Sequence, residues 1–178
     1  QQYEKKISSL AATYDTYLAD LSYAVNDLYN DSRIDKERIF VLAEGKAADA
    51  LPALVKMKNK RIAGALIVGA RPASVAEKDY TDSKKDITAD ASYWMDENST
   101  LPMFILRGEA DFETSHSEYE KWRTVLQGRA HIDYREYKKL KKYLIKTNNQ
   151  KDATDYDTVG KVSTEVCQAM AKWVLNQD

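Results

Sequence analysis

The sequence predicts an α/β fold, a three-layer sandwich around a truncated, mostly parallel sheet of about four strands. Short apolar runs that fit buried strands alternate along the chain with longer segments of helical period. These runs are apolar at consecutive positions, as strands of a parallel sheet are when helices cover both faces. The 178 residues, 43% of them hydrophobic, suffice for one core, so residues 1–178 are predicted to form a single domain.

The N-terminal half is predicted to contain two helices and two strands. Residues 38–43 and 62–68 are short apolar runs that fit buried strands. Residues 46–58 read as a helix, in which Pro52 fits only in the first turn or at a kink. The first helix is long and amphipathic, with apolar side chains three and four residues apart. These side chains are Ile7, Leu10, Tyr14, Leu18, Leu21, Val25 and Leu28.

The C-terminal half continues the alternation after an interruption. Residues 71–100 are polar and irregular, and we interpret them as a shortened lid or insertion. Residues 101–106 and 131–137 are predicted strands. Between them, Ser115 and Glu118 match a capping box that opens a helix running to about residue 127. A final helix is predicted from an apolar stripe formed by Val162, Val166, Met170 and Trp173.

Composition argues against several kinds of partner and ligand. No apolar run approaches the roughly 20 residues that span a bilayer, so no membrane span is expected. Residues 134–146 mix basic and tyrosine side chains, as some single-stranded nucleic-acid sites do. The net charge of −1 gives no general attraction to nucleic acid, so we expect none as a partner. Cys167 is the one cysteine and is expected to be buried in the apolar stripe.

No metal and no cofactor are expected. The acidic residues Asp152, Asp155 and Asp157 invite a calcium interpretation. Their spacing lacks the glycine and the terminal glutamate of a calcium loop, so a solvated loop is the better interpretation.

Five segments follow one another in the order found in a known enzyme superfamily. Residues 35–48 resemble the strand that leads into a nucleophile elbow, Gly-x-Ser-x-Gly, and 62–70 resemble the next strand. Residues 101–111 resemble the strand and loop that carry the catalytic acid, and 137–144 the segment that carries the histidine. Residues 160–163 resemble the start of the last helix. The superfamily is the α/β-hydrolases, notably their dienelactone-hydrolase and acyl-peptidase-like group. The resemblance implies the C-terminal half of that fold.

Two of the three catalytic residues of that superfamily are replaced in this chain. Gly45 stands at the serine position, and Ala43 and Ala47 replace the glycines on either side. Lys142 stands at the histidine position, and Asp111 at the position of the acid. A serine hydrolase needs a hydroxyl, a base and a group that orients the base. Glycine has no side chain and lysine is normally protonated at neutral pH, so Gly45, Asp111 and Lys142 are interpreted as vestigial triad positions.

The resemblance also implies a vestigial pocket, formed by Glu44, Lys46, Tyr93 and Trp94. One oxyanion donor would be the backbone N–H of Lys46. In the superfamily the second donor comes from a loop after an earlier strand, and the resemblance places that strand before residue 1. Tyr93 and Trp94 fall in the shortened lid, which in the superfamily helps to wall the substrate pocket.

Charged residues around the vestigial positions have two interpretations. An ion pair between Asp111 and Lys142, joined by Glu44, would replace the hydrogen bond of the triad, because a lysine relieves the cost of a buried carboxylate. In the alternative, all three are solvated loop residues.

The sequence favours a non-catalytic binding or structural module over an enzyme. The alternative is an esterase or peptidase of the serine-hydrolase kind that needs a missing segment or uses another site. The resemblance implies a larger secreted protein with an extracellular or cell-surface location. The strand 38–43 would lie at an unpaired hydrophobic edge. We expect the N-terminal helix, a second copy in a homodimer, or a completing polypeptide to cover it.

Overall fold

Four parallel strands form the single sheet of the described structure. The computed structural model describes residues 14–58, 60–72, 100–148 and 160–177. The strands are β1 (Phe40–Glu44), β2 (Gly64–Val68), β3 (Met103–Gly108) and β4 (Ile132–Tyr137). They lie in the order β1-β2-β3-β4, and each neighbouring pair is parallel. The predicted fold class is confirmed, and β1 and β4 are the edges of this sheet.

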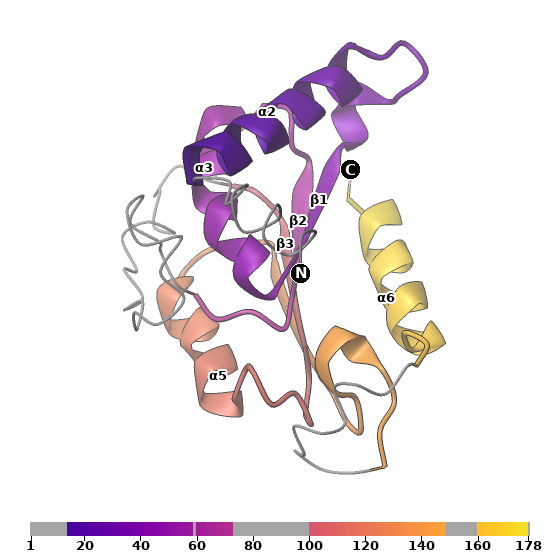
Figure 1. Ribbon diagram of the computed structural model, residues 1–178. Helices are drawn as coiled ribbons and strands as arrows, with labels where there is room; N and C mark the ends of the chain where they lie inside the picture. The colour runs from indigo at the N-terminus through magenta and orange to yellow at the C-terminus, as the bar shows by residue number, and fades with distance from the viewer. Residues whose placement is uncertain (1–13, 59, 73–99, 149–159, 178) are drawn as a thin grey trace, which may run out of the picture.

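Helices cover both faces of the sheet and make it the middle of three layers (Figure 1). One face carries α2 (Tyr14–Asn30), α3 (Leu51–Lys58) and α5 (His116–Val125), and the other carries α6 (Thr164–Leu175). Three short 3-10 helices connect these elements: η1 (Lys36–Arg38), η2 (Gly45–Ala50) and η4 (Lys142–Leu144). No helix among the described residues is long and apolar enough to cross a membrane.

Side chains of the strands alternate between two cores, as the period of a strand requires. On one face, Ile67 and Ile105 pack with α3 and α5 around the fully buried Trp122. On the other, Leu66 and Phe104 pack with α6 around Trp173. Every residue of β2 and β3 is buried, because both strands are paired on each side and covered on each face.

Local sequence signals explain where the helices begin. Ser115 caps α5, and its capping box with Glu118 is present as predicted. Pro52 lies in the first turn of α3, where the missing N–H leaves no hydrogen bond unmade. The expected burial of Cys167 is wrong, because its side chain is exposed. Val166 faces the sheet, and the next residue in a helix points about 100° away from it.

The predicted lid, residues 71–100, lies outside the described residues except at its ends. The interpretation of this segment as a lid or insertion therefore stays a prediction, as does the single-domain organisation of residues 1–178.

Replacing Trp122 by Ala is expected to lower the free energy of unfolding by about 3–5 kcal/mol. The change opens a cavity in the core and removes the hydrogen bond from Trp122 Nε1 to the Ala70 carbonyl, 2.8 Å long. Urea unfolding followed by circular dichroism measures the loss. Leu175→Ala is the control, because this side chain on α6 is 71% exposed and should change stability by no more than about 0.5 kcal/mol. Equal losses in both variants would contradict the described packing.

Candidate functional site at the carboxyl edge of the sheet

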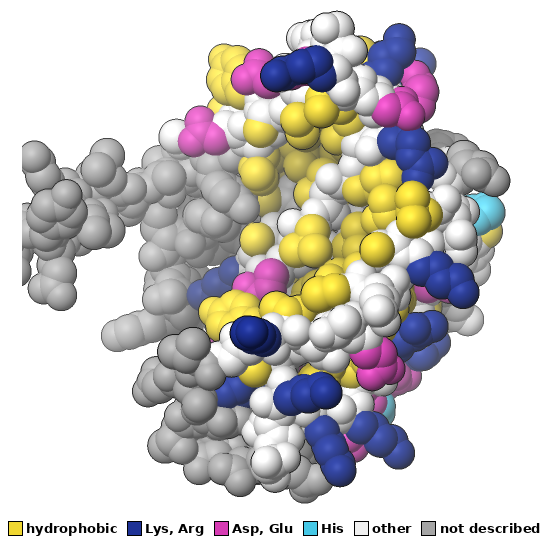
Figure 2. All heavy atoms as spheres, turned by 90° about the vertical axis from the view of Figure 1, so that its right-hand side faces the viewer, with side chains coloured by type: hydrophobic (Ala, Val, Ile, Leu, Met, Phe, Trp, Pro, Cys, Tyr) yellow, Lys and Arg dark blue, Asp and Glu magenta, His cyan; other side chains and the backbone are white. Residues whose placement is uncertain are grey.

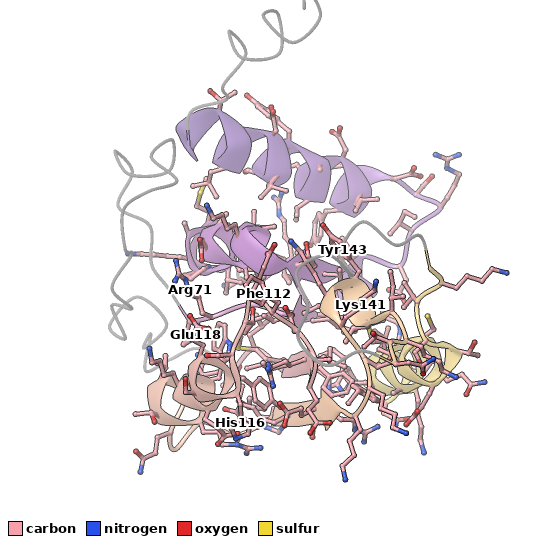
Figure 3. All side chains as sticks on the ribbon, turned by 60° about the horizontal axis from the view of Figure 1, so that its bottom comes forward. Arg71, Phe112, His116, Glu118, Lys141 and Tyr143 are labelled. Carbon is pink, nitrogen blue, oxygen red and sulfur yellow. The ribbon has the colours of Figure 1, made fainter. Side chains whose placement is uncertain are left out.

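Three connections meet at the carboxyl edge of the sheet. The chain leaves β1 at Gly45, β3 through residues 109–114 and β4 through residues 138–144. Parallel strands end at one edge, and ligands of open α/β sheets bind beyond it. Figure 3 looks onto this edge, where Phe112 and Tyr143 project near the centre of the view. Gly45, Asp111 and Lys142 all lie on these connections.

The connection after β1 has the course of a nucleophile elbow. The backbone turns at Gly45 with a φ of +54° and enters η2, which continues into α3. This strand–turn–helix path is the one that exposes the serine in an α/β-hydrolase. A Cβ built on Gly45 would meet no other atom within 4 Å. Position 45 therefore opens onto free space.

The connection after β3 is tied to the end of β2 through Asp111. This carboxylate is 4% exposed, and its Oδ1 accepts the N–H groups of Glu113 and Thr114 at 2.9 and 3.3 Å. Thr114 Oγ1 donates to the Gly69 carbonyl at 2.7 Å. A Cβ on Gly69 would lie 2.8 Å from Asp111 Oδ2, so this close approach requires glycine at position 69.

A buried arginine holds the same connection from beneath. Arg107 on β3 is 2% exposed, and its Nε donates to the Thr114 carbonyl at 2.6 Å. Its Nη2 donates to the Glu109 carbonyl at 3.3 Å, and its Nη1 makes an ion pair with Glu136 on β4. Arg107 is not among the predicted site residues, although a charge at the end of the apolar run 101–106 is a visible signal.

Lys142 is held by a carboxylate that the sequence did not point to. Its Nζ donates to Glu113 Oε2 at 2.6 Å. Burial lowers the pKa of Lys142, but the hydrogen bond and the charge of Glu113 outweigh burial and leave that pKa above its usual value. Lys142 is therefore protonated at neutral pH and cannot accept a proton as a base. The predicted pair of Lys142 with Asp111 stays a prediction.

Glu44 belongs to the same electrostatic environment. Burial raises the pKa of its carboxyl, and the charges of Glu113 and Asp111 raise it further, while Lys142 opposes them. Three carboxyl groups and one ammonium group therefore influence one another at this edge. Among the described ranges, no group of three or more His, Cys, Asp and Glu side chains could hold a metal ion.

Asp49 is a second buried carboxyl close to the elbow. It lies in η2 with 5% of its surface exposed. Burial raises its pKa to about 7, although the charges of Arg71 and Lys46 partly oppose this. Asp49 is not among the predicted site residues. The signal for it was weak, a lone charge in the run Ala47-Ala48-Asp49-Ala50.

The remaining predicted pocket residues divide into two pairs. Glu44 and Lys46 flank Gly45, and the side chain of Lys46 is exposed. Tyr93 and Trp94 lie outside the described residues, so their place in a pocket stays a prediction.

The chain has the α/β-hydrolase fold, which its similarity to solved structures establishes. It matches SOBER1 from Arabidopsis thaliana with a TM-score of 0.60 and 10% identity, over 94% of this chain and 66% of that one. It matches dipeptidyl peptidase 4 from Porphyromonas gingivalis with a TM-score of 0.60 and 12% identity, over 90% and 22%. It matches a monoacylglycerol lipase from Paleococcus ferrophilus with a TM-score of 0.57 and 10% identity, over 93% and 76%.

The similarity is one of structure alone. No protein-family model and no curated protein sequence matches the chain. The chain spans just under two thirds of the SOBER1 chain and about a fifth of the dipeptidyl peptidase chain. At 10–12% identity these neighbours define the fold, and function has to be argued from the site itself.

The buried carboxyl of Asp49 is expected to make the protein less stable as the pH rises. The pKa of Asp49 is about 7 in the folded chain against a model value of 3.8. Its favourable contribution is therefore complete below about pH 4 and is lost as the pH rises through about 7. Asp49→Asn stays neutral, so it should gain roughly 2–4 kcal/mol relative to the wild type between acid and pH 8.

Urea unfolding at a series of pH values tests this expectation. Asp20→Asn on α2 is the matched control, because Asp20 is exposed and its replacement should leave the pH profile of the wild type unchanged. Parallel profiles for wild type and Asp49→Asn would show that Asp49 ionises in the folded protein as easily as in the unfolded chain.

Proposed function

We propose that the chain is a non-catalytic, hydrolase-like module that acts by binding. The observation that carries the proposal is the pair of side chains at the two key positions. Gly45 occupies the turn after β1 and offers no nucleophile. Lys142, which the resemblance aligns with the catalytic histidine, is ion-paired with Glu113, which favours its protonated form. Nucleophilic catalysis needs a hydroxyl or thiol with a base in reach, and neither is present at these positions.

The open side of β1 is the binding surface of this proposal. Among the described strands, only β2 pairs with β1. Leu42, in the middle of β1, is 56% exposed, and an exposed apolar edge strand is a template for pairing with another chain. A second copy or a completing polypeptide would satisfy this edge. Helix α2 packs against α3 and leaves Leu42 exposed.

The purified chain is expected to show no hydrolase activity. With p-nitrophenyl esters, its rate should equal that of the heat-denatured chain. A fluorophosphonate probe, which labels activated serines, should leave it unlabelled.

Gly45→Ser restores the hydroxyl and is expected to remain unlabelled at pH 7, because a protonated Lys142 cannot remove its proton. Serine at the positive φ of position 45 costs about 1–2 kcal/mol, so circular dichroism first establishes that the variant folds. Labelling of Gly45→Ser would mean that Lys142 acts as a base. Saturable ester hydrolysis by the wild type, lost on replacing one of its serines, would favour the esterase or peptidase alternative.

A further inference from the structure

The backbone of β1 presents one open row of hydrogen-bonding groups. On the β2 side, the Ile39 carbonyl accepts the N–H of Ala63 at 2.7 Å. Backbone groups of successive residues in a strand point to opposite sides. The N–H and C=O groups of Phe40, Leu42 and Glu44 therefore point away from β2, where no described strand lies.

The side chains on this edge are apolar and incompletely covered. Phe40 and Leu42 share the face of the sheet that α6 covers. Phe40 packs edge-on against Trp173, with ring centroids 6.1 Å apart, whereas Leu42 remains 56% exposed. Figure 2 looks at the molecule from the side of β1 and α6 and shows apolar side chains gathered in a hollowed band. Residues 39–43 carry no charge and no proline, the usual protections of an edge strand.

We propose that β1 pairs antiparallel with β1 of a second copy of this chain across a two-fold axis. The two four-stranded sheets then become one continuous sheet. The inference rests on the proposed binding role of the β1 edge and names the partner. A two-fold interface uses the same patch on both copies, so the patch must be complementary to itself.

The sequence of β1 has this self-complementarity in one register. Hydrogen-bonded pairs must join residues whose backbone groups point outward, so even-numbered residues face even-numbered ones. With the axis at Val41, Phe40 faces Leu42 of the second copy, and the exposed leucine gains an apolar neighbour. With the axis at Leu42, Phe40 would face Glu44 of the second copy, which sets a carboxylate against the ring.

Charges at the two ends of β1 favour the same register. Arg38 lies at the amino end and donates to the carbonyls of Val174 and Gln177 at 2.9 and 3.0 Å, which fixes its positive charge there. Glu44 lies at the carboxyl end. With the axis at Val41, Arg38 faces Glu44 of the second copy, and the symmetry makes this match twice. An unrelated partner strand would not require the two ends of β1 to complement each other.

Sedimentation equilibrium of the whole chain across micromolar concentrations tests the dimer. The expected mass is twice the 20.3 kDa of one chain. Leu42→Lys places a charge at the centre of the edge and should raise the dissociation constant at least about tenfold. Met57→Lys on α3 is the control, because Met57 is 53% exposed and lies away from β1, so this variant should remain dimeric. Circular dichroism checks the fold of both variants.

Cysteine cross-linking tests the register. In a chain with Cys167→Ser, Val41→Cys should form an intermolecular disulfide on oxidation, because residues on the axis lie about 4.5 Å apart at Cα. Leu42→Cys should not, because its counterpart is Phe40 of the second copy. Cross-linking at position 42 in place of 41 would overturn the proposed pairing.

A chain that stays at 20.3 kDa throughout the range would overturn the second-copy proposal and leave the edge to a completing polypeptide. A dimer that Leu42→Lys leaves intact would overturn it as well, since the interface would then lie elsewhere. Both results are independent of the ester and fluorophosphonate assays, which test whether the module is non-catalytic.

Discussion

Arg107 leaves β3 with its guanidinium buried between β4 and the connection 109–114, and the carboxyl edge of the sheet depends on it. It donates to the carbonyls of Thr114 and Glu109 and pairs with Glu136. A buried guanidinium is stable only when such partners surround it, and its loss would leave them uncompensated. The position of Glu113, and through it the ion pair with Lys142, follows from this anchored connection.

The hydrolase fold supplies the geometry of a catalytic edge without the groups that catalysis needs. β1 still turns sharply at a positive φ into η2 and α3, and Asp111 still lies buried beside the end of β2. The turn carries a glycine, and the lysine that follows β4 is neutralised by Glu113. A fold with this edge hosts many activities, so the side chains at its ends, and not the fold, lead to the proposal of a binding module.

Sequence patterns predicted the elements well because their signals are local. Apolar runs gave the strands, and the capping box of Ser115 and Glu118 gave the start of α5. Contacts between distant segments were beyond such patterns. Lys142 meets Glu113 across 29 residues, and this pairing depends on how Arg107 and Asp111 shape the connection after β3. The burial of Asp49 and the exposure of Cys167 likewise follow from which side of a helix faces the core.

The charge state of Lys142 tests the central claim most directly. The account requires a protonated ammonium group at the position that the resemblance assigns to the catalytic base. A pH titration of the Lys142 side-chain nitrogen by NMR, with the ¹⁵N-labelled protein, measures this. The account predicts a pKa above the ordinary lysine value of 10.5, and a lower pKa in Glu113→Gln, which removes the carboxylate of the ion pair. Titration of Lys142 near neutral pH would make it a competent base and would contradict the account.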